Sequence, residues 1–228
     1  MYFDKLNLIF IHIPKNAGTS IENTILAKYY KYDPALYKQR WFDSITKNTI
    51  MWNMISFMYT RDTIPELPNK YISNIIHEYH QKHIDYCKTM DITKKRIFTI
   101  VRHPQSRIES LYKFTQLYNF CTFDEFIKRF IGPDRRDNVP VISNTQFEYL
   151  CDVTGKLDDR IHILRYETLN DDWKSFCKQH KLKCKTLLRE NVSIIDKPIQ
   201  IIWTDELRKI VYNQFKDDFD HFGYTLIQ

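Results

Sequence analysis

Residues 8–20 read LIFIHIPKNAGTS, and this stretch decides the fold. Its first part, residues 8–13, is continuously apolar except for His12, which is typical of a strand buried on both faces of a parallel sheet. A short polar turn follows. From about Ser20 onward, apolar residues recur at helical spacing, at Ile21, Ile25 and Leu26. The stretch therefore predicts a buried strand, a tight turn and a helix in direct succession.

The same succession occurs again around residue 100. Residues 96–102 (RIFTIVR) predict a second buried strand, and Pro104 suits the first turn of the helix that follows. The apolar stripe of this helix comprises Ile108, Leu111, Tyr112 and Thr115. A third strand is predicted at residues 161–164 and a weaker one at residues 71–76. Strands that alternate with helices predict an α/β domain with a mainly parallel sheet.

The C-terminal part predicts one long helix with Thr204 as its N-cap. The buried stripe of this helix comprises Leu207, Ile210, Val211, Phe215, Phe219 and Phe222. Residues 32–68 lack a clear period, and we expect an irregular excursion there that borders an acceptor cleft. Because no boundary is apparent, we expect a single domain over residues 1–228.

The composition excludes several classes of protein. Of the 228 residues, 43% are hydrophobic and 15% aromatic, so the chain can bury a core and is not disordered. Its apolar runs fall far short of the roughly 18 residues that span a bilayer. The N-terminal residues lack a signal-peptide pattern, so we expect a cytoplasmic protein without a membrane span. The net charge of +6 favours an anionic ligand over nucleic acid as a partner.

The pattern of cysteines indicates neither a disulfide framework nor a metal site. There are five, at irregular spacings and without a Cys-x-x-Cys pair: Cys87, Cys121, Cys151, Cys177 and Cys184. We therefore expect packed, reduced thiols, and neither a zinc site nor a set of disulfides.

The turn at residues 14–20 has the chemistry for holding a phosphate. Backbone N–H groups and the helix dipole favour an anion where a helix begins. Lys15 adds a positive charge, and Gly18 lets the backbone approach the ligand. The Walker A sequence places its lysine directly after a glycine, whereas Lys15 precedes Gly18, which disfavours a Mg²⁺-dependent kinase. The alternative without a ligand is a corner capped by Thr19 or Ser20, whose hydroxyls would otherwise donate to the anion.

A second anion-binding corner is predicted after the strand at residues 96–102. Arg102 ends that strand and can fork onto a phosphate, and Ser110 adds a hydroxyl about two turns into the next helix. Ligands of open α/β sheets collect outside such strand ends. The alternative is a salt bridge at the helix start, with Arg107 paired to an acidic neighbour on the surface. Two such corners predict a ligand with two separated phosphate-like groups.

Two segments resemble the sulfotransferases. Residues 11–20 (IHIPKNAGTS) resemble their 5′-phosphosulfate loop, and residues 99–112 (TIVRHPQSRIESLY) resemble their 3′-phosphate motif. The likeness is to the carbohydrate-type branch, which includes the heparan sulfate 2-O-sulfotransferases and compact microbial relatives. Supporting segments follow in the expected order, at 146–150, 164–169, Asn191 and 218–224. The resemblance spans nearly the whole chain and implies a P-loop-type three-layer fold.

The resemblance also implies a donor substrate, 3′-phosphoadenosine 5′-phosphosulfate (PAPS), and no metal. Its phosphosulfate would be held by Lys15, Asn16, Ala17, Gly18, Thr19 and Ser20. Arg102 and Ser110 would hold the 3′-phosphate, and residues 189–193 would close over the nucleotide. Sulfuryl transfer, like phosphoryl transfer, passes through a loose in-line transition state. Lys15 is therefore also expected to stabilise the charge that develops on the leaving oxygen.

The acceptor hydroxyl needs a base, and a neutral histidine suits this role near pH 7. His77, His80 and His83 recur every third residue. On a helix, two of them could form a pair of zinc ligands, but no third ligand is indicated and the usual His-Glu-x-x-His spacing is missing. We favour His77 because it follows the apolar stretch 71–76, and because its separation from Arg102 is similar to that of the base in compact relatives. Those relatives continue His-x-Thr-Ala, whereas this chain has Glu-Tyr-His, so His80 stays an alternative.

The sequence thus predicts a sulfotransferase that acts on a hydroxyl, with a glycan as the expected acceptor. Basic clusters at 128–136 and 181–189 suit an anionic glycan, although for any one of them we favour a solvated face. Two other functions compete with this interpretation. One is a kinase-like phosphotransferase on the same scaffold, and the other is a non-catalytic module that retains the nucleotide pocket.

Overall fold

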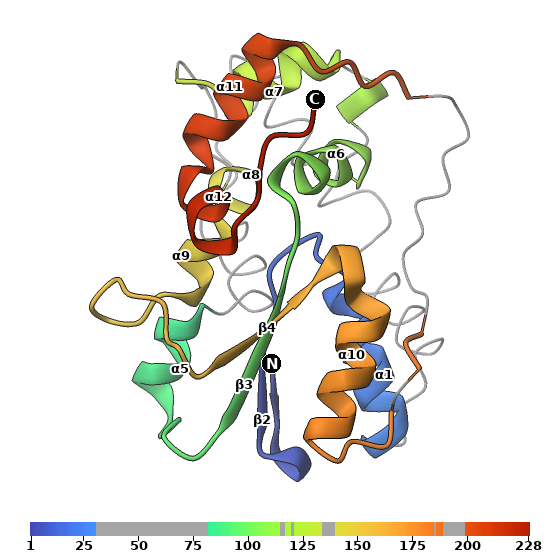
Figure 1. Cartoon of the computed structure of the whole chain (residues 1–228), viewed down its shortest axis with the longest axis vertical. Coiled ribbons are helices and arrows are strands. Elements are labelled where there is room, and N and C mark those ends of the chain that lie inside the picture. Colours follow the sequence, from blue (N-terminus) through green and yellow to red (C-terminus); the bar gives the residue numbers. More distant parts are fainter. Residues whose placement is uncertain (31–81, 115–116, 120, 134–139, 185, 189–198) are drawn as a thin grey trace, which may run out of the picture.

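The computed structural model describes residues 1–30, 82–114, 117–119, 121–133, 140–184, 186–188 and 199–228 (Figure 1). The irregular excursion expected at 32–68 and the weak strand expected at 71–76 lie outside these ranges. None of the helices in the described ranges combines the length and the apolar character that a membrane crossing needs.

Within these ranges the sheet has four strands in the order β1-β2-β3-β4: β1 (Tyr2–Phe3), β2 (Leu8–Ile11), β3 (Arg96–Val101) and β4 (Ile161–Arg165). Strands β2, β3 and β4 are parallel, and Phe98 pairs with Phe10 on one side and His162 on the other. Strand β1 pairs antiparallel with β2 and was not predicted. The three main strands are confirmed, and the fold is α/β with a mainly parallel sheet.

The described helices are α1 (Gly18–Tyr30), α5 (His83–Thr89), α6 (Pro104–Phe114), α7 (Phe123–Phe130), α8 (Pro140–Ser143), α9 (Gln146–Leu150), α10 (Leu169–Gln179), α11 (Asp205–Gln214) and α12 (Lys216–Phe222). Three short 3-10 helices accompany them: η1 (Asp4–Leu6), η2 (Leu117–Asn119) and η3 (Tyr166–Thr168).

Alternate residues of the buried strands pack against different helices. Phe10 lies in one apolar cluster with Ile21 of α1 and Trp173 of α10. Its neighbour Ile9 points the other way, into a cluster with Tyr86 of α5. Figure 1 shows α1 and α10 on one side of the sheet and α5 on the other. This is the three-layer arrangement of P-loop-type folds, and it explains why the strands read as continuous apolar runs.

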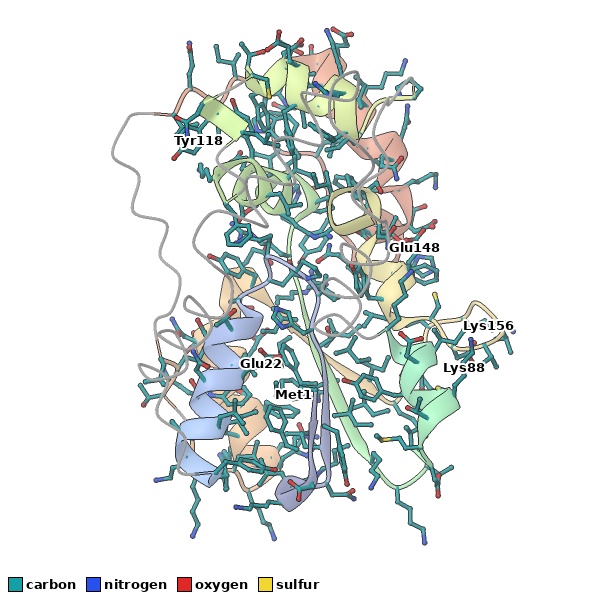
Figure 2. The ribbon with its side chains drawn as sticks, turned by 180° about the vertical axis from the view of Figure 1, so that it is seen from behind. Met1, Glu22, Lys88, Tyr118, Glu148 and Lys156 are labelled. Carbon is teal, nitrogen blue, oxygen red and sulfur yellow. The ribbon has the colours of Figure 1, made fainter. Side chains whose placement is uncertain are left out.

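A third apolar cluster lies beyond the carboxyl ends of the strands. Leu111 of α6, Phe126 of α7 and Val211 of α11 are fully buried in it. These helices fill the top of Figure 1, and Figure 2 shows Tyr118 at this helical end and Met1 at the sheet. The carboxyl ends of the strands therefore lie between the sheet and this layer of helices.

The C-terminal helix departs from its prediction in one respect. The cap is confirmed, because Thr204 Oγ1 accepts a hydrogen bond from the Leu207 amide at 3.3 Å. However, the expected single helix is interrupted at Phe215, where φ is −108° and ψ is 27°. The break turns Asp218 inward, where its carboxylate accepts from the Phe147 amide at 2.9 Å. The apolar periodicity predicted one continuous helix, and a buried polar contact accompanies the break in it.

The surface ion pair considered for Arg107 is wrong. The residue is 1% exposed. Its guanidinium donates to the carbonyl oxygens of Pro14 at 3.3 Å and Asn144 at 3.0 Å. Arg107 therefore ties the turn after β2 to the segment that precedes α9.

All five cysteines are free in the structure, and two of them, Cys177 and Cys184, are buried.

Candidate functional site

The turn after β2 has the backbone shape of an anion-binding loop. Lys15 and Ala17 both lie in the left-handed region, with φ of 69° and 63°. Left-handed residues in such turns build concavities of backbone N–H groups that bind anions. Helix α1 begins at Gly18, and the Ala17 carbonyl accepts from the Ser20 amide at 3.1 Å. Thr19 and Ser20 therefore lie in the first turn, and the corner capped by either hydroxyl is wrong.

Gly18 is required by a close approach of another side chain. A Cβ built there would lie 2.2 Å from the His12 imidazole, a distance that real Cβ atoms do not show. His12 is held in place by stacking on Phe10 and by an Nδ1 contact of 3.0 Å to Glu22. The expected reason for the glycine was an approach to the ligand, whereas the nearest atoms in the structure belong to the protein.

Lys15 is a partly desolvated cation. Its Nζ lies 3.6 Å from the ring centroid of Phe114, at the end of α6. Burial lowers the pKa of Lys15 to about 8, and the nearby charge of Arg102 acts in the same direction. Phe114 itself is 52% exposed, so the ammonium lies at the edge of the molecule. The residue is thus charged at pH 7 and discharged by a small rise in pH.

Arg102 lies beside that turn, directly after β3. Its Nη1 donates to the Lys15 carbonyl at 3.0 Å, and its Nε donates to Ser106 Oγ at 2.9 Å. The guanidinium carbon lies 3.9 Å from the ring centroid of Tyr166, which directly follows β4. The hydroxyl that contacts Arg102 is therefore that of Ser106. Ser110 lies half-buried further along α6.

The two predicted corners are thus one place in the fold, and its charge is not neutralised. Within the described residues, neither Lys15 nor Arg102 forms an ion pair with a carboxylate; both lie over aromatic rings instead. Two cations this close repel each other unless an anion joins them. The arrangement is therefore suited to a ligand with more than one negative group.

Beneath these cations lies a layer of buried amides. Asn16 and Gln146 are both fully buried, and Asn16 Nδ2 donates to Gln146 Oε1 at 2.6 Å. Asn16 therefore faces the interior, where it donates also to the Ile100 carbonyl at 2.7 Å. Its own Oδ1 has no hydrogen-bond partner within the described residues. Asn16 shapes the loop from below, whereas Lys15 faces outward.

The C-terminal segment braces the start of α6. The His103 amide donates to Glu167 at 2.7 Å, and Tyr224 Oη donates to the other oxygen of that carboxylate at 3.1 Å. Gln105 exchanges two hydrogen bonds with the backbone of Ile227, of 2.7 and 3.2 Å. The segments that only supported the resemblance, around 164–169 and 218–224, are thus brought to the same helix start.

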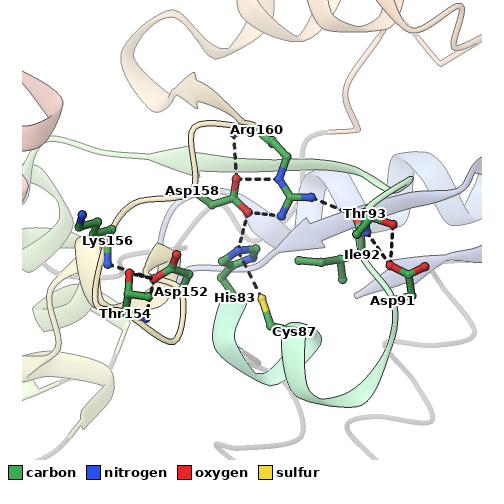
Figure 3. Close-up of polar contacts among 10 residues, drawn as sticks. All are labelled: His83, Cys87, Asp91, Ile92, Thr93, Asp152, Thr154, Lys156, Asp158 and Arg160. Carbon is green, nitrogen blue, oxygen red and sulfur yellow. Dashed lines mark hydrogen bonds and ion pairs between the residues drawn. The ribbon is translucent and has the colours of Figure 1, made fainter.

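His83, the third histidine of the run, has a structural role (Figure 3). Its side chain is 0% exposed, and its Nε2 contacts Asp158 at 2.9 Å. Arg160 holds the same carboxylate through two hydrogen bonds from its side chain and one from its backbone amide, and it lowers the pKa of Asp158 to about 2. Burial lowers the pKa of His83. Asp158 lies just before β4, at the end of the sheet opposite Arg102.

The remaining predicted site residues cannot be placed. His77, His80 and residues 189–193 lie outside the described ranges. Among the residues that are described, no group of three or more His, Cys, Asp or Glu side chains has the geometry to hold a metal ion.

Several residues around the site escaped the sequence analysis. Ser106 and Tyr166 carried a usable signal, because one lies a helical turn after Arg102 and the other directly follows a predicted strand. Phe114 was assigned to no stripe because it lies on the exposed side of its helix. Gln146 and Asp218 entered the sequence analysis only as members of the supporting segments 146–150 and 218–224. Their contacts gave no local signal, since their partners are 44 to 130 residues away in the chain.

Comparison with known proteins places this geometry in a family. A sequence model of the sulfotransferase family matches residues 1–225. No curated protein and no solved structure matches the chain. The family match contains both corners and the four described strands. The chain therefore belongs to the sulfotransferase family, whose reaction is the transfer of a sulfuryl group.

Proposed function

We propose that the protein transfers a sulfuryl group from PAPS to an acceptor hydroxyl, within a single domain spanning residues 1–228. The observation that carries the proposal is the pair of cations beyond the carboxyl ends of neighbouring parallel strands, Lys15 and Arg102, which form no ion pair with a carboxylate within the described residues. A nucleotide with a phosphosulfate at one end and a phosphate at the other supplies the anions that such a pair requires.

Each corner takes one end of this donor in the proposal. The loop that comprises Lys15, Asn16, Ala17, Gly18, Thr19 and Ser20 binds the 5′-phosphosulfate through its backbone N–H groups and the ammonium. Arg102 binds the 3′-phosphate, and Ser110 adds its hydroxyl from α6. Ser106, which already orients the guanidinium, is a further candidate for this phosphate.

The transfer itself needs a cation and a base. The acceptor oxygen bonds to sulfur while the bond between sulfur and the bridging phosphate oxygen breaks, and the negative charge passes to the leaving bisphosphate. Lys15 stabilises that charge, because it is still mostly protonated at pH 7 although burial lowers its pKa to about 8. His77 takes the proton of the hydroxyl, with His80 as the alternative base. No step in this scheme calls for a metal.

The acceptor is proposed to be a carbohydrate, on the strength of the resemblance to the carbohydrate-type branch. The basic clusters add limited support. Lys128 is paired with Asp124 at 3.1 Å and with Glu206 at 3.3 Å, which favours a solvated face for that cluster. A glycan panel with graded sulfation and charge therefore tests this part of the proposal.

The donor is tested by titration calorimetry with 3′-phosphoadenosine 5′-phosphate (PAP), with AMP and with ATP plus Mg²⁺ as comparisons. We expect PAP to bind most tightly. A preference for ATP with Mg²⁺ would favour the kinase-like alternative and overturn the donor assignment.

The base is tested by His77→Ala, with His80→Ala as the matched control. General-base catalysis contributes about 10²- to 10⁴-fold to a rate. We expect turnover to fall by about that factor in the first variant, while PAP affinity stays unchanged. Loss of turnover in the control alone would move the base to His80. A wild-type protein that binds PAP but sulfates none of the tested acceptors would favour the non-catalytic module.

A further inference from the structure

Gln146 begins α9, outside both phosphate-binding corners, yet it contacts a residue of each. We propose that Gln146 is a positioning residue, which fixes the distance between the loop that binds the phosphosulfate and the strand end that binds the 3′-phosphate. The inference rests on the proposed function. It assigns the donor's two-ended binding to a side chain that touches neither end of it.

The contacts of Gln146 join the two corners directly. Its Oε1 accepts from Asn16 Nδ2 at 2.6 Å and from the Arg102 amide at 2.8 Å. Its Nε2 donates to the Arg102 carbonyl at 2.8 Å and to Asp218 Oδ2 at 3.2 Å. One primary amide offers two acceptor and two donor positions, so the capacity of this side chain is filled.

The orientation of this amide is fixed by the backbone of Arg102. A backbone N–H only donates and a carbonyl only accepts, so the oxygen and nitrogen of Gln146 can face Arg102 in only one way. Asn16 is fixed in the same manner, because its Nδ2 also meets the carbonyl of Ile100. The two corners are therefore held in one fixed position relative to each other.

A second link between the corners is of a different kind. It runs from the Arg102 guanidinium to the Lys15 carbonyl. The guanidinium is the group that a phosphate recruits, so this link competes with the ligand. Gln146 forms its hydrogen bonds with the backbone of Arg102 instead, which leaves the Arg102 side chain available to a phosphate. Its link is therefore the one that persists when the donor is bound.

The anchor beneath Gln146 is rigid. Asp218 is 0% exposed, and its other oxygen accepts from the Phe147 amide at 2.9 Å. A buried amide whose own two donor and two acceptor positions are all filled has little freedom to move. The break in the C-terminal helix at Phe215 thus supplies the support on which Gln146 rests.

Fixed separation matters because the donor binds at two points. When one end is bound, the other is presented to its site at a high effective concentration, provided that the two sites match the length of the ligand. Loss of the match lowers the affinity for the two-ended ligand and leaves each one-ended fragment unaffected. A merely structural role for Gln146 predicts equal losses for all three.

The experiment measures Kd by titration calorimetry for PAP, adenosine 3′-monophosphate and adenosine 5′-monophosphate. The variants are Gln146→Met, which keeps the length of the side chain, and Gln214→Met as the matched control. Gln214 belongs to α11 and donates to the Ser143 carbonyl at 2.8 Å. In Gln146→Met we expect PAP to weaken by about tenfold or more while each monophosphate changes by less than about twofold. The control should leave all three unchanged.

Two results would overturn the inference: an unchanged PAP affinity in Gln146→Met, or a loss of the same factor for PAP and both fragments. A wild-type protein that does not prefer PAP over its fragments overturns the proposed function instead, so the two failures are distinct.

Gln146→Glu serves as a second variant, because its side chain has the same shape. A carboxyl that is fully buried beside Asp218 has a raised pKa, and in its protonated form it donates to the Arg102 carbonyl as the amide does. The preference for PAP over its fragments should therefore be retained at neutral pH. It should be lost as the pH rises and the carboxyl ionises, because its second oxygen then faces the Arg102 carbonyl and Asp218. A loss of the preference at neutral pH in this variant, with the fold intact by circular dichroism, also contradicts the inference.

Discussion

The charged side chains just before the amino end of β4 neutralise one another, whereas two cations beyond the carboxyl ends of β2 and β3 form no ion pair within the described residues. At the amino end, Asp158 is shared by buried His83 and by Arg160 (Figure 3). At the carboxyl ends, the contacts of Arg102 and Lys15 within the described part of the chain are to a carbonyl, a hydroxyl and aromatic rings. The first arrangement stabilises the fold, and the second reserves its charge for a ligand.

The sharpest test of this contrast removes the arginine of each site in turn, Arg102 in one variant and Arg160 in another. Arg102→Ala should weaken PAP binding by about 100-fold, because a desolvated guanidinium–phosphate contact is worth about 2 to 3 kcal/mol. Arg160→Ala should change PAP affinity by less than about twofold. Calorimetry on both variants decides the matter. Equal losses of affinity would mean that the two ends of the sheet are not functionally distinct.

Asp158→Asn should have the complementary effect on stability. We expect the free energy of unfolding to fall by about 2 kcal/mol, because His83 and Arg160 lose a charged acceptor that is mostly buried. Urea unfolding followed by circular dichroism measures this loss, and PAP affinity at a fixed pH should not change.

The acid dependence of that variant gives a second check on Asp158. The pKa of Asp158 is held down to about 2 in the fold, so its contribution is complete above the unfolded value of 3.8. It is lost as the pH falls through about 2. The difference in stability between wild type and Asp158→Asn should therefore be constant above pH 4 and shrink below it. A difference that persists undiminished towards pH 2 would show that charge is not its source.

Lys15 gives the smallest of these effects, as a pH dependence of donor binding. With a pKa of about 8 the ammonium is mostly protonated at pH 7 and mostly neutral at pH 9. Since PAP stays ionised over this range, its affinity should fall by about tenfold between the two values. Lys15→Arg should remove the dependence, because a guanidinium does not titrate there. A flat profile in the wild-type protein would mean that Lys15 does not meet the donor.

The sequence predicts some of these features and misses others, and the reason is how far apart in the chain the interacting residues lie. Strands with apolar residues on both faces, such as β2, are visible in the sequence because burial alone dictates their composition. Lys15 and Arg102 are visible because each immediately follows such a strand. The link through Gln146 is not, because it depends on the relative placement of segments 44 residues or more apart. The helix break at Phe215 was missed for the same reason, since an apolar period says nothing of a distant backbone amide.

That break also sets a rule about chain length. An α-helix turns by about 100° for each residue, so one residue inserted between Phe215 and Asp218 would swing the carboxylate away from the Phe147 amide. Substitutions at the two exposed positions in between, Lys216 and Asp217, leave that angle untouched. In this short stretch the number of residues is therefore constrained more tightly than their identity, and insertions or deletions should be rarer here than changes of side chain.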